Sequence, residues 1–379
     1  MSLTQHLSAD YIVYSPGRIN LIGEHTDYND GWVLPSAINK EIKLYFKENS
    51  HPSICSVYSQ SLNKKFSFDL TNIQKSTVEW ENYVLGVIDQ LQKNGFNLKG
   101  FDVSIESDLP SGSGISSSAA LECGIGMGLN EMFQLHIPRE DIVKMAQKAE
   151  QTFVGTQCGV MDQYASVMSK DNTFILLDCR SLAATYIPVD LDNYNLVLLN
   201  TKVSHSLASS EYNTRRAECE KVVTTLRKKY DDVNALRDVT LPMLNEFKEY
   251  LTPTLFKRAK FVISENSRVL KAAETLHQKD FYALGNLMYE SHNGLQHDYE
   301  VSCKELDFLV DFSRYNKAVL GSRMMGGGFG GCTISLVEKG ISSFFIDQAY
   351  NAYKKEFNLK LDSMIVQPTS GTRIQKLNS

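Results

Sequence analysis

In the first half of the chain, short apolar runs alternate with longer segments of helical period, which predicts strands separated by helices. Tyr11–Tyr14 and Ile42–Phe46 are rich in aromatic and β-branched residues, and Phe101–Ile105 alternates like a half-buried strand. A helix is predicted to begin at Pro138, because apolar residues recur after it at i, i+3, i+4 and i+7. A second helix is predicted to begin near Val160. The apolar positions are Ile142, Met145, Ala146 and Ala149 in the first helix and Met161, Tyr164, Ala165 and Met168 in the second.

The second half of the chain continues this mixture of elements. Ser206–Tyr230 is predicted as a long helix with charged residues along its surface, whereas Asn195–Leu199 and Thr333–Val337 have the composition of strands. The predicted boundary between two domains is Pro188–Asn195, a short stretch rich in proline, aspartate and asparagine. We therefore predict two domains of mixed α and β structure, residues 1–190 and 191–379.

The composition limits the partners of the protein. Of the 379 residues, 42% are hydrophobic and 22% are charged, and the formal net charge is −5. These values are ordinary for a soluble globular protein, and a negative chain has no general attraction for nucleic acid or acidic membranes. The densest basic stretch, between Arg215 and Lys229, is interleaved with glutamates, which is typical of a solvated helix face. We expect neither nucleic acid nor a membrane as a partner.

The cysteines and the N-terminus point to the cytoplasm. Seven cysteines are scattered without a Cys-x-x-Cys pair, which favours reduced thiols over a disulfide framework or a zinc site. The first residues, MSLTQHLSADY, have neither the basic start nor the apolar core of a secretory signal. No apolar run approaches the roughly 18 residues that span a bilayer. We expect a cytoplasmic, enzyme-like protein that is a monomer or a weak homodimer.

Three glycine-rich segments carry the candidate chemistry. They are Ser15–Asn29 (SPGRINLIGEHTDYN), Leu109–Glu122 (LPSGSGISSSAALE) and Met324–Leu336 (MMGGGFGGCTISL). Each segment alone is compatible with an ordinary turn. Their combination, in this order and at this spacing, predicts a phosphoryl-transfer enzyme in which a sugar pocket adjoins a nucleotide site.

The central segment predicts a phosphate site. Gly112, Ser113 and Gly114 follow a predicted strand, and three serines stand where the next helix begins. Glycines let backbone N–H groups turn toward a ligand, and a helix N-terminus adds unpaired N–H groups and the positive end of its dipole. A plain turn with a serine N-cap is the alternative. The segment is not a Walker A motif, and Ser117 stands where a Rossmann fingerprint has its third glycine.

The first segment predicts a sugar site. Arg18, Glu24, His25 and Asp27 gather within ten residues around two glycines. Carboxylates and a neutral imidazole are the acceptors that several sugar hydroxyls require, and Arg18 offers a permanent charge for a transferring phosphoryl group. A capped turn with a surface ion pair is the alternative.

The third segment, Gly326–Gly331, precedes a predicted strand. We expect it to bring the backbone of the second domain against the central segment, with Phe329 filling the core beside it. Glycines also serve simple close packing, and this alternative stays open.

Gly17–Asn29 resembles the signature of the galactokinases, within the GHMP family of small-molecule kinases. Leu109–Glu122 resembles the phosphate loop of that family, and Met325–Thr333 resembles its C-terminal glycine motif. Ser291–His297 departs from the family, which more often has a serine, an arginine and an acidic residue at positions 294, 296 and 297. Further matches extend over nearly the whole chain: Trp80–Val84, Cys158–Gln163, Ser210–Arg216 and Tyr299–Ser302.

The resemblance implies a fold and a set of site residues. An N-terminal domain like the second domain of ribosomal protein S5 and a ferredoxin-like C-terminal domain would enclose the active site in the cleft between them. The implied catalytic residues are Asp162 and Arg18. The implied galactose contacts are Glu24, His25, Asp27, Gly159 and Tyr212. The implied ATP contacts are Gly112, Ser113, Gly114, Ser116, Ser117, Ser118 and Trp80, and the implied Mg²⁺ ligands are Ser118 and Glu150.

The local pattern agrees with two of these roles. Glu150 shares the inward face of its predicted helix with Ala146, and a carboxylate there needs a cation or another partner. A salt bridge at the helix end is the alternative. Asp162 stands in the first turn of its predicted helix, where the dipole favours the ionised form and makes the carboxylate a weak base. An aspartate that serves only the dipole is the alternative.

The implied activity is phosphorylation of the anomeric hydroxyl of D-galactose by MgATP, which gives galactose 1-phosphate and ADP and begins galactose catabolism. Asp162 either accepts the proton of that hydroxyl or only orients the sugar, and both mechanisms stay open. One rival function is a kinase for N-acetylgalactosamine or arabinose, although the HTDYN run favours unsubstituted galactose. The other is a galactose- and ATP-binding sensor. Sensors have lost residues in the serine-alanine part of the phosphate loop, whereas Ser116–Ala120 is complete here.

Overall fold

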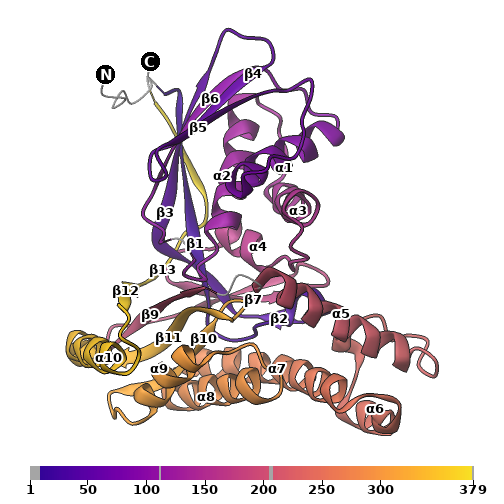
Figure 1. Cartoon of the computed structure of the whole chain (residues 1–379), viewed down its shortest axis with the longest axis vertical. Coiled ribbons are helices and arrows are strands. Elements are labelled where there is room, and N and C mark those ends of the chain that lie inside the picture. Colours follow the sequence, from indigo (N-terminus) through magenta and orange to yellow (C-terminus); the bar gives the residue numbers. More distant parts are fainter. Residues whose placement is uncertain (1–8, 111, 205–207, 378–379) are drawn as a thin grey trace.

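The computed structural model describes residues 9–110, 112–204 and 208–377, and within these ranges the chain forms two stacked halves (Figure 1). The strands are β1 (Tyr11–Asn20), β2 (Trp32–Val33), β3 (Pro35–Glu48), β4 (Ile54–Ser59), β5 (Lys64–Asp69), β6 (Phe101–Ser107), β7 (Thr173–Asp178), β8 (Ala184–Pro188), β9 (Tyr194–Ser204), β10 (Val319–Met325), β11 (Gly330–Glu338), β12 (Asp362–Val366), β13 (Pro368–Thr369) and β14 (Arg373–Lys376). The helices are α1 (Glu79–Lys93), α2 (Ser117–Met132), α3 (Arg139–Ala149), α4 (Met161–Met168), α5 (Ala208–Leu226), α6 (Leu241–Glu246), α7 (Pro253–His277), α8 (Phe281–His297), α9 (Lys304–Arg314) and α10 (Ser342–Phe357).

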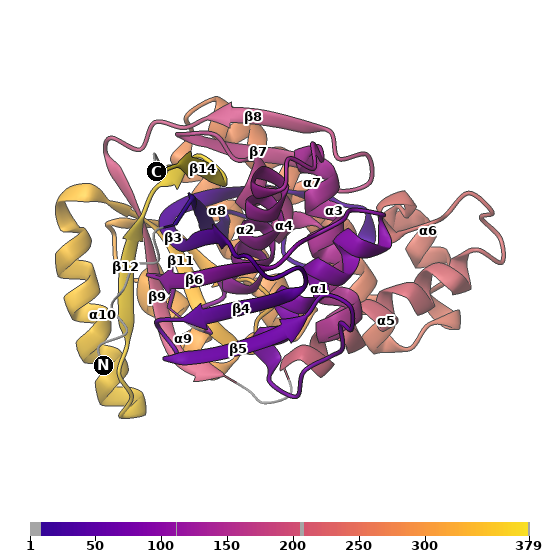
Figure 2. The same cartoon turned by 90° about the horizontal axis from the view of Figure 1, so that it is seen from above.

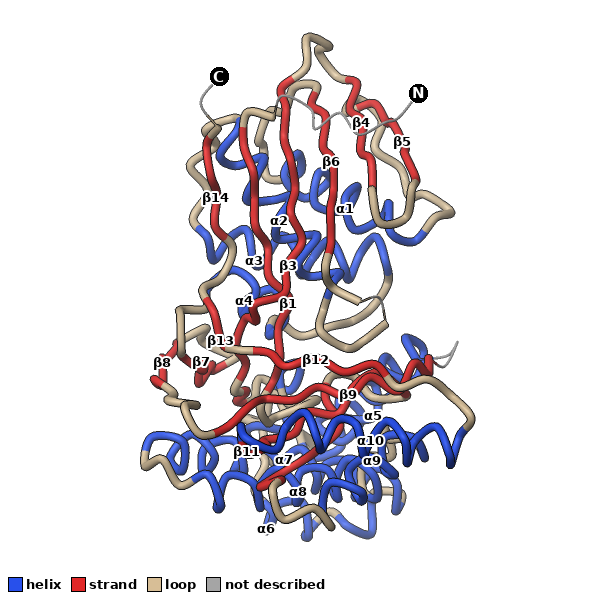
Figure 3. The backbone as a smooth tube through the Cα atoms, turned by 90° about the vertical axis from the view of Figure 1, so that its left-hand side faces the viewer, coloured by secondary structure: helices blue, strands red, loops and turns tan. Residues whose placement is uncertain are grey.

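The upper half is built on a mostly antiparallel sheet with the strand order β14-β1-β3-β6-β4-β5, and β13 pairs with β3. Only the β4–β6 pair is parallel among the pairs of this sheet. Figure 3 shows strands β14, β1, β3 and β6 in front of helices α1 to α4. One face of the sheet is thus covered by helices, which explains the alternating burial along β4.

Helix α2 lies close against this sheet because its sequence is rich in small residues. A Cβ atom at Gly124 would stand 2.5 Å from the Leu44 side chain, and one at Gly128 would stand 2.3 Å from the Phe46 ring. Larger residues at these two positions would push the helix off β3. The close packing places the N-terminus of α2, and therefore the central glycine-rich segment, beside the end of β1.

The lower half contains a four-stranded antiparallel sheet with the order β10-β11-β9-β12. Helices connect β9 to β10, a hairpin joins β10 to β11, and α10 leads to β12. This is the connectivity of a ferredoxin-like domain, as the family resemblance implied. Seen from above, α10 lies at one end of the molecule and helices α5 and α6 lie at the other (Figure 2).

The two halves share a core and exchange strands. One cluster of buried residues includes Leu196, Val269 and Cys332 together with the residues between the upper sheet and its helices. After β12 the chain returns to the upper half, where β13 pairs with β3 and β14 with β1. The upper sheet therefore contains strands from both ends of the chain. The predicted division into residues 1–190 and 191–379 stays a prediction.

Most of the predicted elements lie within observed ones. The predicted strands fall within β1, β3, β6, β9 and β11, and the two predicted helices correspond to α3 and α4. The long helix predicted from Ser206 is observed as α5, while Ser206 itself lies outside the described residues. Within the described ranges, the helices are too short or too polar to cross a membrane.

Candidate active site

A pocket of about 280 Å³ lies where the three glycine-rich segments meet. It is lined by the predicted residues Arg18, Glu24, His25, Asp27, Gly112, Ser113, Gly114, Ser116, Ser117, Ser118, Glu150, Gly159, Asp162 and Tyr212. It is also lined by Ile115, Thr156, Cys158, Met161, Gly326 and Gly327. Trp80 is not among the lining residues. It lies on α1 with its ring 5.1 Å from that of Phe66, and its assignment to the nucleotide stays a prediction.

An ion pair between Arg18 and Asp162 crosses the floor of the pocket. Arg18 Nε lies 2.7 Å from Asp162 Oδ1 and Nη2 lies 2.8 Å from Oδ2, so the two planar groups meet in the bidentate manner. Arg18 Nη1 donates to the Gly114 carbonyl at 2.6 Å. Burial alone would lower the pKa of Arg18, but the Asp162 carboxylate outweighs it, and the net pKa is raised. The guanidinium therefore stays charged although only 4% of its side chain is exposed.

The phosphate loop is tied to this ion pair by Ser116. This residue adopts a left-handed backbone conformation with φ 58° at the N-cap of α2, and its hydroxyl donates to Asp162 Oδ2. The Ser113 hydroxyl donates to the Pro110 carbonyl at 2.6 Å. Two of the predicted phosphate contacts are thus engaged within the protein. Ser117 and Ser118 lie in the first turn of α2, where backbone N–H groups and the helix dipole favour an anion.

Glu150 ends α3 and begins a π-helical turn that extends to Val154. Its side chain is buried beside Gln163, whose Nε2 donates to Glu150 Oε2 at 2.8 Å and to Glu122 Oε2 at 3.2 Å. Burial, followed by the charge of Asp162, raises the pKa of Glu150 to about 7. Burial and the charge of Glu150 raise the pKa of Glu122 well above its usual value. A cation bound at Glu150 would offset the negative charge of these neighbouring buried carboxyl groups.

The described residues contain no group of three or more His, Cys, Asp or Glu side chains that could hold a metal ion by themselves. Mg²⁺ does not require such a group beside a nucleotide, because it keeps several waters and binds through one or two carboxylates plus substrate phosphates. Glu150 and the Ser118 hydroxyl line the same pocket. The residues present therefore fit a magnesium ion that is shared with a phosphate.

The first glycine-rich segment, Ser15–Asn29, is the predicted sugar loop. Its side chains Glu24, His25 and Asp27 face the opposite side of the pocket, and Glu24 is the most firmly held of them. Its Oε1 accepts the Gly326 N–H at 2.8 Å, and its Oε2 accepts from Asn20 Nδ2 at 2.6 Å. Arg323 Nη2 completes an ion pair with Oε2 at 2.5 Å. The carboxylate is therefore fixed from both halves of the molecule.

His25 is neutral, because burial lowers the pKa of its ring to about 3. Its Nε2 lies 3.2 Å from the Gly327 carbonyl, which can only accept, so Nε2 carries the proton. Nδ1 then accepts from the Tyr28 hydroxyl at 2.8 Å. The expected neutral imidazole is present, but both ring nitrogens already have protein partners. The assignment of His25 as a galactose contact stays a prediction.

Asp27 requires the glycine at position 159. A Cβ atom there would stand 2.1 Å from Asp27 Oδ2. Burial, followed by the negative charge of Asp162, raises the pKa of Asp27 to about 7, although Oδ1 accepts the Tyr28 N–H at 2.9 Å. Tyr212 of α5 closes this side of the pocket, with its ring 5.3 Å from the rings of His25 and Tyr28.

The third glycine motif lies against the phosphate loop, as predicted. A Cβ atom at Gly326 would stand 3.2 Å from the Gly114 carbonyl oxygen, and one at Gly328 would stand 2.1 Å from the Val301 carbonyl oxygen. Phe329 is half-buried against a core cluster of the lower half, and its N–H donates to the same Val301 carbonyl at 2.7 Å. The motif needs its glycines for close backbone approach.

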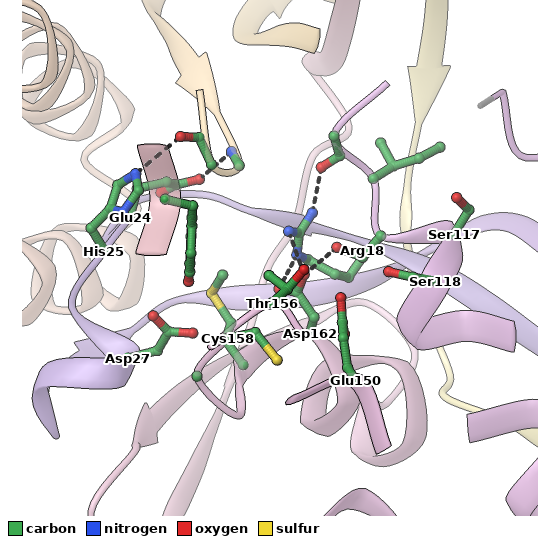
Figure 4. Close-up of a pocket in the computed structure, with 18 of the residues that line it drawn as sticks. Arg18, Glu24, His25, Asp27, Ser117, Ser118, Glu150, Thr156, Cys158 and Asp162 are labelled. Atoms are coloured by element: carbon green, nitrogen blue, oxygen red, sulfur yellow. Dashed lines mark hydrogen bonds and ion pairs between the residues drawn. The ribbon is translucent and has the colours of Figure 1, made fainter. Parts of the chain in front are cut away.

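The charges of the pocket divide into two sides. Figure 4 shows Ser117, Ser118 and Glu150 on one side of the Arg18–Asp162 pair and the three sugar-loop residues on the other. One side thus offers N–H groups, hydroxyls and the Glu150 carboxylate, and the other offers the carboxylates of Glu24 and Asp27 and the His25 ring. Asp162 and Arg18 lie between them. This arrangement suits the transfer of a phosphoryl group to a polyhydroxylated acceptor.

Comparison with known families agrees with this geometry. Residues 82–170 match the GHMP kinases N-terminal domain, and residues 272–355 match the GHMP kinases C-terminal domain. The fold and the pocket therefore define a small-molecule kinase of the GHMP class. Residues 4–47 match the galactokinase galactose-binding signature.

Individual relatives identify the family within this class of kinases. The chain is 42% identical to the galactokinase of Thermotoga petrophila over 96% of this chain and 99% of that one. It is 40% identical to the galactokinase of Clostridium beijerinckii over 96% and 95% of the two chains. The crystal structure of Lactococcus lactis galactokinase complexed with galactose superposes with a TM-score of 0.92 at 34% identity, over 98% of this chain and 95% of that one. The chain belongs to the galactokinase family.

A more distant comparison concerns the fold alone. Methanococcus jannaschii mevalonate kinase superposes with a TM-score of 0.65 at 17% identity, over 95% of this chain and 98% of that one. The two chains therefore share a fold.

Several residues of the pocket were not predicted. Cys158 and Met161 belong to the matched segment Cys158–Gln163, so the sequence held a signal for them. Thr156 carried no such signal. Its loop is held by Asn213 of α5, whose Oδ1 accepts the Gln157 N–H at 2.9 Å. Such support from the other half of the molecule has no local pattern in the sequence.

The raised pKa of Asp27 predicts a pH-dependent effect on stability. The folded protein without ligands keeps this proton up to about pH 7, whereas an unfolded chain loses it near pH 3.8, the ordinary pKa of an aspartate. Ionisation of Asp27 therefore lowers stability increasingly between these two values, and the full cost remains above them. We predict that Asp27→Asn raises the melting temperature at pH 8 and raises it less at pH 5, as measured by thermal denaturation without sugar or nucleotide.

The matched control for this experiment is Asp347→Asn on α10, where the side chain is exposed. This variant should melt like the parent at both pH values. An equal shift for Asp27→Asn at pH 5 and pH 8 would contradict the burial of an ionisable group at position 27.

Proposed function

We propose that the protein transfers the γ-phosphoryl group of ATP to the anomeric hydroxyl of D-galactose and releases galactose 1-phosphate and ADP. The observation that carries the proposal is the division of one pocket by the Arg18–Asp162 pair into a phosphate side and a carboxylate-rich side. Membership of the galactokinase family supports galactose as the acceptor. The reaction would be the first phosphorylation step of galactose catabolism.

The sugar would bind between Glu24, Asp27 and Tyr212. Carboxylates accept hydrogen bonds from sugar hydroxyls, and rigidly held ones also reject epimers whose hydroxyls point elsewhere. Glu24 meets the rigidity requirement, because its carboxylate has three protein partners. Gly159 would allow the sugar and Asp27 to approach the same backbone segment.

The triphosphate would lie along Gly112–Gly114 and the first turn of α2. Ser118 and Glu150 would hold Mg²⁺ between them and the phosphates. When bound, the ion would offset the negative charge of the phosphoryl group during transfer. The protein supplies the remaining positive charge through Arg18 and the N-terminus of α2.

Asp162 would contact the anomeric hydroxyl from the floor of the pocket. It stands in the first turn of α4 and accepts hydrogen bonds from Arg18 and Ser116. These partners hold the carboxylate in one orientation, which fits an acceptor that orients the sugar hydroxyl, and its role as a base stays open. In either role it aligns the attacking oxygen with the phosphorus, and Arg18 neutralises the charge beside it.

The setting proposed for this reaction is the cytoplasm, with galactose and ATP as partners and a monomer or weak homodimer as the working form. All seven cysteines are free thiols in the structure, which fits a reducing compartment.

The acceptor is tested by ADP release with MgATP and four sugars: D-galactose, D-glucose, N-acetylgalactosamine and arabinose. We predict the highest kcat/KM for galactose and at least a roughly 10²-fold lower value for glucose, because the fixed carboxylates would be left unpaired by the epimer. A higher kcat/KM for N-acetylgalactosamine or arabinose would identify the protein as a kinase for that sugar. Tight galactose binding without turnover of any sugar would identify a sensor.

The catalytic pair is tested by Asp162→Asn and Arg18→Ala. We predict that both variants lose more than the roughly 10²-fold in kcat that general-base help alone supplies, because each change also breaks the ion pair at the transfer point. Steady-state kinetics with galactose and MgATP measure this loss, and circular dichroism checks the fold. Near-normal kcat in Asp162→Asn would remove Asp162 from any catalytic role.

A further inference from the structure

A fully buried arginine supports the sugar loop from the lower half of the molecule. Arg323 lies on β10, directly before the third glycine-rich segment, and its exposure is 0%. Its Nη2 forms the ion pair with Glu24 Oε2 at 2.5 Å, and its Nη1 donates to the Asn20 carbonyl at 3.1 Å. The two residues that it contacts are at or just beyond the end of β1.

Arg323 is one part of a cradle around the Glu24 carboxylate. Asn20 Nδ2 donates to the same Oε2, and the Gly326 N–H donates to Oε1. Asn20 is itself fixed, because its Oδ1 accepts the Leu34 N–H at 3.2 Å. The carboxylate therefore has one cation and two neutral donors, and all three hold it in one orientation toward the pocket.

A buried charge of this kind is costly unless a partner compensates for it. Glu24 is the acidic side chain within ion-pairing distance of Arg323 among the described residues. Removing one member of a buried pair is strongly destabilising, whereas apolar replacement of both members is often tolerated. Because apolar residues could replace both members, stability alone does not explain why Arg323 and Glu24 are present. The position of Glu24 in the pocket does explain it.

We infer that Arg323 is a positioning residue for the sugar acceptor: it fixes the Glu24 carboxylate so that this group accepts a hydrogen bond from a galactose hydroxyl. The inference rests on the proposed function and deepens it. Arg323 would not touch the sugar itself, because it is fully buried and is not among the residues that line the pocket. Its contribution would be to galactose affinity, with little effect on the nucleotide on the far side of the Arg18–Asp162 pair.

The test is a double-mutant cycle on galactose affinity, measured by calorimetry with galactose alone. We predict that Arg323→Met and Glu24→Gln each weaken binding by about 10- to 100-fold, the range of a hydrogen bond to a charged group. The double variant should bind no more weakly than the weaker single variant, because both changes remove the same interaction. MgADP affinity should change less than about twofold in all three proteins. Arg314→Met on α9 is the matched control and should bind galactose like the parent.

Each other outcome contradicts the inference. Additive losses in the double variant would show that Arg323 does not act through Glu24. Parallel losses of galactose and MgADP affinity would show a general structural role. If Arg323→Met does not fold, Arg323→Lys keeps the charge with a different reach, and unchanged galactose affinity in that variant would overturn the inference. If the parent protein binds and phosphorylates no galactose, the proposed function fails instead.

Discussion

The bidentate ion pair between Arg18 and Asp162 is the interaction on which the site depends. Arg18 comes from β1 and Asp162 from α4, so the pair joins a strand of the upper sheet to a helix that follows it by more than a hundred residues. The same guanidinium holds the Gly114 carbonyl, and Ser116 holds the same carboxylate. Strand, helix and phosphate loop are therefore fixed around one pair of charges. Arg18 is buried, and its guanidinium therefore depends on the Asp162 carboxylate for charge compensation.

The lower half is tied to this ion pair because its glycine motif packs directly against the backbone of the phosphate loop. The third glycine motif lies against the phosphate loop where a Cβ atom at Gly326 would be 3.2 Å from the Gly114 carbonyl oxygen. The sugar loop is bound to the same motif through Glu24 and His25, which engage the Gly326 N–H and the Gly327 carbonyl. The loop that precedes the upper sheet's second long strand is thus held largely by the lower half. The predicted phosphate and sugar subsites meet at the boundary between the two halves, which share one core.

The sequence predicted what local patterns encode. Apolar period located α3 and α4, and glycine spacing identified the three segments that converge on the pocket. Arg323 was not foreseen, because its contact with Asn20 joins residues 303 positions apart and leaves no trace in either neighbourhood. The contacts of His25 Nε2 with Gly327 and of the Ser116 hydroxyl with Asp162 were not foreseen for the same reason. The return of β14 to β1 likewise depends on pairing between the two ends of the chain.

A crystal structure with galactose, Mg²⁺ and a non-hydrolysable ATP analogue is the most direct test of phosphoryl transfer across the Arg18–Asp162 pair. We expect the anomeric oxygen within hydrogen-bond distance of the Asp162 carboxylate and in line with the γ-phosphorus. We also expect the γ-phosphate near Arg18 and the ion on Ser118 and Glu150. An anomeric hydroxyl directed away from Asp162, or a triphosphate bound outside the loop formed by Gly112–Ser118, would contradict phosphoryl transfer across the Arg18–Asp162 pair.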